Sequence, residues 1–396
     1  MEITFTYSLT SQQRQLWIEF WAQSPHSHPR QHPDFAGVII GKGEIPLFVM
    51  AIEDHRPVMV GLFSLRPWLW GKRGSIEAVC LSGPVFDEVR YAEEAMPKII
   101  VFFRRLWVGR MRIRPYWNFP EGGSLRSRLA QLGIISTEGP SGSRQTGIIA
   151  LQKTDDEFLD SFSKSARREV RRAERQEVEV REAYSEQDAE IFFQELNRMN
   201  RQRGMGCIPD CESRAMFDTI LRSRDLGVIL NAYHQDVYLG GLMMIRSAHT
   251  AHTSHFVVVP NTLSALSNLR LAPLIWWRGM QWARDKGCVK MDVEGYMPPS
   301  ETYRPSYFIH KYKGEFNPEQ VENMAQYAAV CRPVVNWILK GYSIGSRIVK
   351  LPFRIHYRQL VKSRYQRLVS KTKPADTDSP ETSKSQVDPQ KIEQKS

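Results

Sequence analysis

The sequence predicts an α/β (α+β) protein of two domains, each a mixed sheet flanked by helices. The 396 residues exceed what one hydrophobic core usually serves, so two domains are expected. Segments with the two-residue period of strands alternate with segments of helical period, and this order occurs in both halves of the chain. A hydrophobic content of 42% with 11% aromatic residues is typical of a globular chain.

The first half, residues 1–150, contains both kinds of segment. Residues 47–70 predict two strands joined at Asp54-His55-Arg56, a sequence typical of a hairpin turn. Helical spacing and strand alternation then follow one another along this half. The further elements are expected as helices at 91–107 and 122–133 and as strands at 75–86, 110–117 and 144–151.

The second half, residues 151–325, opens on an apolar stripe with steps of four, four, four and three residues. This spacing predicts one amphipathic helix over 155–176 with a row of arginines above its buried face. Two strands that turn at Gln235-Asp236 are expected in the middle of this half. The stripe residues are Phe158, Phe162, Ala166, Val170 and Ala173, and the other elements are helices at 185–204, 211–227 and 269–287 and strands ending at 259 and 296.

The end of the chain is basic and then polar. Between Met324 and Ala375 there is no acidic residue, and the mixture of Arg and Lys with large apolar residues predicts basic amphipathic helices over 326–371. Residues 372–396 lack aromatic side chains and predict a disordered tail. The net charge of +11 favours anionic partners such as nucleic acid, phosphate-bearing substrates or an anionic membrane surface, without choosing among them.

The location expected for this chain is the cytoplasm. Its five cysteines are an odd, sparse set, which suits a reducing compartment and argues against a disulfide framework. The polar N-terminus has no apolar core of a signal peptide, and no stretch reaches about 18 uninterrupted apolar residues, the length of a membrane span. Peripheral attachment to the inner face of the cell membrane stays open because of the basic segment.

Residues 163–175 carry six basic side chains and two glutamates. Arg167, Arg171 and Arg175 follow one another at i, i+4 and i+8, so they share one face of the expected helix. Such a run is either a solvated helix face or a binding site, since guanidinium groups suit diphosphates bidentately. The sequence leaves both interpretations open.

Two further segments contain candidate chemistry. Residues 307–316 place Lys313 between aromatic residues on an expected strand, where its ammonium could stabilise an oxyanion or anchor a phosphate, or simply face solvent. Asp292 and Glu294 alternate on a short strand, and either could accept a proton from an amine if burial raised its pKa. Exposed carboxylates at a strand end are the other interpretation, and it is favoured for Glu294.

Two other patterns are given no role. Residues 201–206 match an R-x-x-G-x-G string for binding the phosphates of coenzyme A, but the string follows a helix where it should follow a strand, so we expect a helix end. His249 and His255 share a face of their expected strand and His252 points away, so no metal site is expected.

Three of these segments, taken in order, resemble the FemAB/FemX aminoacyltransferases, a branch of the GNAT superfamily. The segments are residues 165–180, 274–295 and 312–321, and the last puts Lys313 at the position of the family's lysine. Residues 81–88 are similar to the Gly-Pro segment of the family's first domain. The resemblance extends over residues 155–322.

This resemblance implies two GNAT-like domains and N-acyl transfer to an amine of a cell-envelope acceptor related to peptidoglycan or polysaccharide. It implies either aminoacyl-tRNA or acyl-CoA as donor and no tightly bound cofactor. Lys313 and Asp292 would be catalytic, and substrate would bind Arg167, Arg171, Tyr307 and Tyr312. Two alternatives remain: an acyl-CoA-dependent N-acetyltransferase of a small molecule or exopolysaccharide precursor, and a non-catalytic protein that binds membrane or RNA.

Overall fold

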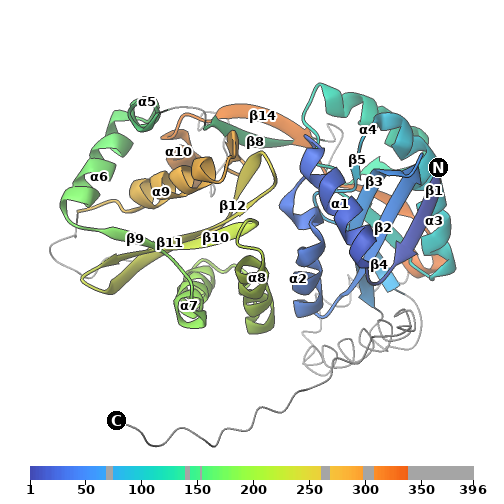
Figure 1. Cartoon of the computed structure of the whole chain (residues 1–396), viewed down its shortest axis with the longest axis horizontal. Helices are drawn as coiled ribbons and strands as arrows, with labels where there is room; N and C mark the ends of the chain where they lie inside the picture. The colour runs from blue at the N-terminus through green and yellow to red at the C-terminus, as the bar shows by residue number, and fades with distance from the viewer. Residues whose placement is uncertain (68–74, 139–142, 152–153, 260–267, 298–306, 338–396) are drawn as a thin grey trace, which may run out of the picture.

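The computed structural model describes residues 1–67, 75–138, 143–151, 154–259, 268–297 and 307–337. Two domains lie side by side, and each is a mixed sheet with helices on both faces (Figure 1). The predicted α/β class with two sheet-and-helix domains is therefore confirmed. No helix within the described ranges has the length and apolar character needed to cross a membrane.

The first sheet has the strand order β1-β2-β3-β4-β6-β15-β7, with β5 paired to β3 at its side. All its neighbouring strands are antiparallel except β4 and β6, which are parallel. The predicted hairpin is the β2–β3 turn, where Asp54 and His55 have positive φ. The strands are β1 Glu2–Thr6, β2 Ile45–Glu53, β3 Arg56–Pro67, β4 Ser75–Cys80, β5 Val85–Phe86, β6 Arg110–Ile113, β7 Ile135–Ser136 and β15 Tyr327–Val330.

Helices cover both faces of this sheet because its strands are apolar on both sides. Leu47 and Val49 of β2 face the cluster formed with α3 and α4, and Phe48 and Met50 face the cluster that contains α1. The predicted helices at 91–107 and 122–133 are confirmed as α3 and α4. The helices are α1 Ser11–Gln23, α2 Ala36–Gly41, α3 Val89–Arg105 and α4 Glu121–Gln131, with short 3₁₀ turns η1 Pro29–Gln31 and η2 Pro33–Phe35.

The second sheet has the strand order β14-β8-β13-β12-β11-β10-β9. Here the single parallel pair is β12 with β13. The β10–β11 hairpin turns at Gln235 and Asp236, both with positive φ, where the sequence predicted the turn. The strands are β8 Ser143–Ala150, β9 Glu179–Glu182, β10 Gly227–His234, β11 Val237–Arg246, β12 Thr250–Val258, β13 Lys290–Asp292 and β14 Glu319–Met324.

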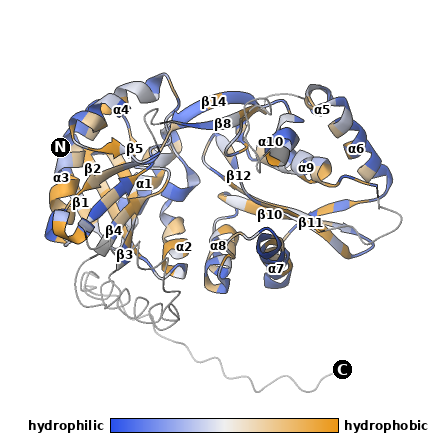
Figure 2. Cartoon of the chain, turned by 180° about the vertical axis from the view of Figure 1, so that it is seen from behind, coloured by the Kyte–Doolittle hydropathy of each residue, from blue (hydrophilic) through white to orange (hydrophobic). Residues whose placement is uncertain are grey.

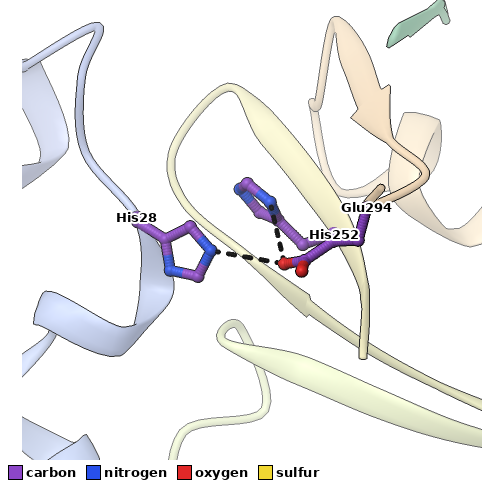
Figure 3. A group of neighbouring side chains, drawn as sticks. All are labelled: His28, His252 and Glu294. Atoms are coloured by element: carbon purple, nitrogen blue, oxygen red, sulfur yellow. Dashed lines mark ion pairs between the residues drawn. The ribbon is translucent and has the colours of Figure 1, made fainter. Parts of the chain in front are cut away.

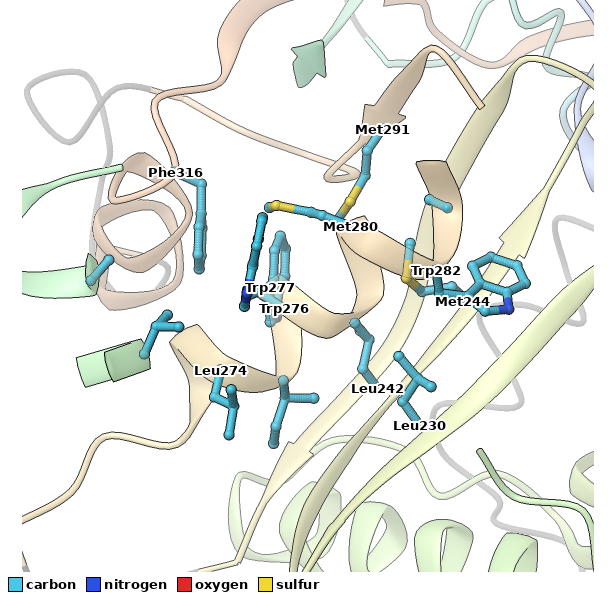
Figure 4. Packing of buried hydrophobic residues seen from close by; sticks show 14 of the residues in the cluster. Leu230, Leu242, Met244, Leu274, Trp276, Trp277, Met280, Trp282, Met291 and Phe316 are labelled. Carbon is cyan, nitrogen blue, oxygen red and sulfur yellow. The ribbon is translucent and has the colours of Figure 1, made fainter. Parts of the chain in front are cut away.

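Helix α9 packs over one face of this sheet and α7 over the other (Figure 1). Trp276, Trp277 and Met280 of α9 are buried in the cluster that contains Leu242 and Met244 of β11 (Figure 4). Burial of such large apolar side chains is the main source of stability here. The helices are α5 Asp155–Ser161, α6 Lys164–Arg175, α7 Glu186–Gln202, α8 Asp210–Arg222, α9 Ala272–Asp285 and α10 Tyr307–Gly314.

The single helix expected over 155–176 is two helices, α5 and α6. Phe162 between them is extended, with ψ 159°. The Ser163 hydroxyl accepts a hydrogen bond from the Ala166 N–H at 3.1 Å and so caps α6. The apolar stripe misled the prediction because Phe158 and Val170 on either side of the break are buried in the same core.

The chain exchanges strands between the domains. Strand β8, expected in the first half, pairs with β13 and β14 of the second sheet. Strand β15 lies beyond residue 325, where a basic helical extension was expected, and pairs with β6 and β7 of the first sheet. The rest of that extension and the tail, residues 338–396, lie outside the described residues.

One apolar cluster spans both domains. It contains Trp17 and Trp21 of α1 together with Phe192 of α7 and Phe217 of α8. Helices α2 and α8 also approach so closely that a Cβ atom on Gly41 would lie 2.5 Å from the Ala215 Cβ. The two domains are therefore packed on each other, and the surface between them is fixed in shape.

Candidate functional site

The site lies where the parallel strands β12 and β13 separate. Their pairing ends at His252 and Asp292, because β13 stops at Asp292 while β12 continues to Val258. Past this pair, no residue of β13 pairs with β12. The ladder between β12 and β11 also shifts register there, so that Ser254 is an extra residue in the manner of a β-bulge.

Asp292, one of the predicted catalytic residues, is buried and accepts three hydrogen bonds. Its carboxylate accepts from the Tyr116 hydroxyl at 2.9 Å, the Thr146 hydroxyl at 2.5 Å and the Glu294 N–H at 2.7 Å. Tyr116 belongs to the first domain, so this bond joins the domains. Burial raises the pKa of Tyr116 well above its ordinary value, and the Asp292 charge adds to the effect.

Glu294 faces two histidines that the sequence did not connect with it (Figure 3). Its Oε1 lies 3.6 Å from His28 Nε2 and 3.9 Å from His252 Nδ1. The exposed position favoured for Glu294 is wrong, since its side chain is 25% exposed and those of His28 and His252 are 2% and 0% exposed. A left-handed backbone at Glu294, with φ 53°, turns the side chain out of strand register into this group.

Burial favours the neutral form of both histidines, whereas neighbouring groups favour the ionised form of Glu294. Burial lowers the pKa of His28 and of His252, and the nearby carboxylates only partly oppose this. Burial alone would raise the pKa of Glu294, but the His28 interaction and the Arg30 charge outweigh it and hold that pKa below its usual range. The Arg30 N–H donates to His28 Nδ1 at 3.1 Å, so His28 carries its ring proton on Nε2, facing Glu294.

Lys313 lies beside the same loop. Its ammonium donates to the carbonyl oxygens of Glu294 and of Gly295, the latter at 3.0 Å. Burial lowers the pKa of Lys313 to about 8, and the charges of Glu294 and Asp292 act in the opposite direction. The sequence therefore selected two residues, Asp292 and Lys313, that the fold brings to one place.

The segment that carries Lys313 is a helix, α10, and the predicted strand is wrong. Of the aromatic residues that suggested a strand, Tyr312 points from this helix into the core. The ring of Tyr312 packs against Trp276 and Phe316, with centroids 5.5 and 5.3 Å away. Tyr312 is thereby half-buried, while Tyr307 lies at the start of α10 with a side chain outside the described residues.

Arg167 and Arg171 lie on α6, and neither is among the residues that line the space in front of Asp292. Arg167 forms an ion pair with Asp160 at 2.6 Å, and Arg171 is exposed. Most residues of α6 are hydrophilic (Figure 2). The start of α6 does approach the end of α10, because the Ser163 N–H donates to the Glu315 carbonyl at 2.8 Å.

A cationic cleft opens between the domains in front of Asp292 and Glu294. It encloses about 430 Å³, part of it open to solvent. Sequence reasoning missed most of its lining, because these residues are scattered over the first domain and β8 and carry no motif. The lining includes His28, Arg30, Arg114, Tyr116, Arg144 and Thr146.

The R-x-x-G-x-G string and the histidines around β12 were given no role from the sequence. Arg201 and Gln202 end α7 and Gly204 has φ 67°, so the R-x-x-G-x-G string is a helix end, as predicted. His249 is exposed whereas His252 is buried, so these two histidines do not meet. The stretch after β12, where a phosphate-binding loop would lie, falls largely in residues 260–267, outside the described residues.

Comparisons with known proteins agree with this fold. Residues 160–303 match the model of an acetyltransferase (GNAT) domain. The solved structure of FemX is similar with a TM-score of 0.68 and 14% identity, covering 86% of this chain and 99% of that one. No curated protein matches the chain.

Two other solved structures are similar over comparable lengths. A tandem GNAT protein from the clavulanic acid biosynthesis pathway has a TM-score of 0.50 and 13% identity, covering 84% of this chain and 99% of its own. A conserved protein of unknown function from Bacteroides thetaiotaomicron has a TM-score of 0.54 and 12% identity, covering 84% and 100%.

Residues 160–303 thus match an acyltransferase domain of the GNAT class, and the chain has two mixed sheets flanked by helices. In fold the chain is similar to FemX over nearly the whole length of that protein. The resemblance stated from the sequence motifs is thus confirmed.

Proposed function

We propose that this protein transfers an acyl or aminoacyl group to an amine of a phosphate-bearing, cell-envelope acceptor, at the point where β12 and β13 separate. The observation that carries the proposal is the convergence of Lys313 and Asp292 on the loop after β13. An ammonium held beside an opening in a sheet is suited to a reaction in which negative charge develops on a carbonyl oxygen.

In the proposed reaction the amine nitrogen attacks the carbonyl carbon of a thioester or ester. A C–N bond forms, the carbonyl oxygen becomes an oxyanion, and the C–S or C–O bond then breaks. The nitrogen loses one proton and the leaving sulfur or oxygen gains one. Lys313 spends two of its three N–H donors on the Glu294 and Gly295 carbonyls, which leaves one for the oxyanion.

Asp292 acts in this proposal by positioning the loop. Three donors already occupy its carboxylate, so it is poorly placed to accept a proton from substrate. Its bond to the Glu294 N–H instead fixes the turn whose carbonyls hold Lys313. This differs from the direct proton transfer considered from the sequence.

The acceptor's phosphates have two candidate sites. The first site is the one inferred from the resemblance, and it contains Arg167 and Arg171. Tyr307 and Tyr312, which are close to Lys313 in the sequence, would contact the substrate as well. The exposed guanidinium of Arg171 supports that choice, while the ion pair of Arg167 with Asp160 must open first. The arginines of the interdomain cleft are a second choice, because they lie in front of Asp292.

Acyl-CoA is the donor that the GNAT domain favours, and aminoacyl-tRNA is the alternative. The acceptor would be lipid-linked if the basic segment 326–371 holds the enzyme against anionic lipid on the inner face of the membrane. Salt-sensitive co-sedimentation of the full chain with anionic but not neutral vesicles is expected. Equal binding to both vesicle types would remove the membrane part of the proposal.

The test of the reaction supplies labelled acyl-CoA and labelled aminoacyl-tRNA in parallel, each with amine acceptors that carry or lack a diphosphate. One donor should give a labelled amide, and the diphosphate should lower KM. Lys313→Met should reduce kcat by about 100-fold, the effect of losing one oxyanion donor, while Lys311→Met on the exposed side of the same helix should not.

A folded Lys313→Met variant with unchanged turnover would refute the catalytic assignment. Arg171→Met should raise KM only for acceptors that carry a diphosphate, and Arg105→Met, an exposed arginine on α3 of the first domain, is its control. If neither donor yields product while RNA binds in a salt-sensitive, sequence-indifferent way, the non-catalytic interpretation would replace this one.

A further inference from the structure

One buried polar group, made of His28, His252 and Glu294, has no role in the proposed acyl transfer. We propose that these three side chains bind a divalent transition-metal ion, with Zn²⁺ as the expected occupant. The site joins the two domains, because His28 comes from the loop that leads into η1 of the first domain and the other two come from the second (Figure 3). This inference does not depend on the acyl-transfer proposal.

The donor atoms are of the right kind and close together. Two imidazole nitrogens and one carboxylate oxygen are a common ligand set for Zn²⁺ with a fourth position open. One donor atom from each residue lies within 4.8 Å of the others, and the two histidine–glutamate distances are 3.6 and 3.9 Å. Tetrahedral Zn²⁺ with bonds of about 2.1 Å separates its ligands by about 3.4 Å, so small side-chain rotations suffice.

His252 supplies an independent observation. Its side chain is 0% exposed, and neither ring nitrogen has a hydrogen-bond partner among the described residues. A buried polar atom without a partner costs about 1–3 kcal/mol, so such atoms usually indicate a ligand or bound water. Its Nδ1 lies 3.9 Å from the Glu294 carboxylate, the direction in which a cation would sit.

The residues around the three side chains allow a metal ion to enter and also limit how tightly it can bind. His28 and Glu294 line the interdomain cleft, so an ion can enter, and the fourth position would face the cleft. The Arg30 N–H donates to His28 Nδ1, and a metal at Nε2 would move the ring proton to Nδ1 and break that bond. Loss of this outer contact should weaken binding by about 10- to 100-fold relative to a site whose second imidazole nitrogen keeps its hydrogen bond.

The experiment titrates the full chain with Zn²⁺, and with Co²⁺ as a visible-absorption probe of tetrahedral nitrogen and oxygen ligation. Cys207 and Cys211 are exposed and four residues apart, so they could bind Zn²⁺ adventitiously. All measurements therefore use a Cys207→Ser/Cys211→Ser background. One saturable ion per chain and a rise in Tm on Zn²⁺ addition are expected, because the ion binds only the folded, docked domains.

Variants decide the ligand set. His28→Gln, His252→Gln and Glu294→Gln should each weaken Zn²⁺ binding by about 100-fold or more, since loss of a ligand exceeds the loss of an outer contact. His249→Gln, an exposed histidine beside β12, should leave affinity unchanged. Circular dichroism shows which variants fold, and Glu294→Gln, at the partly exposed position, decides the matter if a histidine variant does not.

Two results would overturn the proposal. One is the absence of saturable binding of either ion to the background protein at millimolar concentration. The other is affinity within twofold of the background in any folded variant of the three ligands. If the background protein binds no ion and Glu294→Gln also loses acyl transfer, the metal proposal is wrong. The three side chains would then be assigned to proton transfer instead.

Discussion

His252 and Asp292 are the last paired residues of strands β12 and β13, and His252 Nδ1 lies 4.0 Å from Asp292 Oδ2. Both side chains are buried, and Tyr116 of the first domain bonds to the same carboxylate. The point at which the second sheet opens is therefore also the point at which the first domain is attached. Changes at this pair should affect both stability and catalysis.

Asp292→Asn should destabilise the fold by about 1–3 kcal/mol. The carboxylate accepts three hydrogen bonds, and the NH2 group of asparagine would place a donor against at least one of these donors. Urea unfolding measures the change. Asp236→Asn is the matched control: Asp236 is exposed in a left-handed turn that asparagine also tolerates, so its midpoint should not move. Equal midpoints for wild type and Asp292→Asn would contradict the assigned role.

Titration of Lys313 should make the catalytic activity fall with rising pH and the stability of the fold increase with rising pH. Its folded-state pKa of about 8 lies below the ordinary 10.5, so turnover that needs the ammonium should fall as pH rises through about 8. Between about pH 8 and 10.5 the unfolded chain binds more protons at this residue, so its contribution to stability should rise with pH.

Lys313→Met, which cannot titrate, isolates both effects. The stability difference between wild type and variant should shift in favour of wild type from pH 8 to pH 10, measured by urea unfolding at each pH. A difference that stays constant with pH would show that Lys313 titrates as an ordinary lysine.

Glu77 is a buried carboxylate in the first domain that forms ion pairs with Arg66, Arg110 and Arg112 at 3.2, 2.6 and 2.5 Å. Glu77→Gln should cost about 3 kcal/mol, because three guanidinium groups lose their common anion in a half-buried place. Glu93→Gln, whose pair with Arg128 is largely exposed, should cost under about 1 kcal/mol. Thermal unfolding of the two variants should therefore differ clearly, and similar losses would contradict this account.

Two helical glycines should respond to alanine with opposite signs. At Gly279 of α9 a Cβ would lie 2.7 Å from atoms of Leu242 and Met244, so Gly279→Ala should destabilise by about 1–3 kcal/mol. At Gly123 of α4 the nearest atom would be 3.8 Å away, so Gly123→Ala should stabilise by up to about 1 kcal/mol. Calorimetry on both variants tests the close approach of α9 to its sheet.

Local pattern was informative wherever one segment decided its own structure. The hairpins at Asp54-His55 and Gln235-Asp236 follow from turn sequence, and α3, α4 and α9 follow from apolar period. The pattern failed where a local helix cap or a tertiary contact competed with it. Ser163 capped a helix in the middle of an unbroken apolar stripe, and aromatic packing on Trp276 made residues 307–314 helical.

By itself the sequence determined the class of fold and the FemX-like resemblance, and it singled out Asp292 and Lys313 as candidates, because these depend on composition, period and motifs within single segments. Only the tertiary structure decided that β8 and β15 change domains and that His28, His252 and Glu294 meet. His28 lies more than 200 positions from the other two in the chain. Such pairings depend on which sheets and domains pack together. The apolar period of a segment shows which face is buried, but it does not show which distant segment packs on that face.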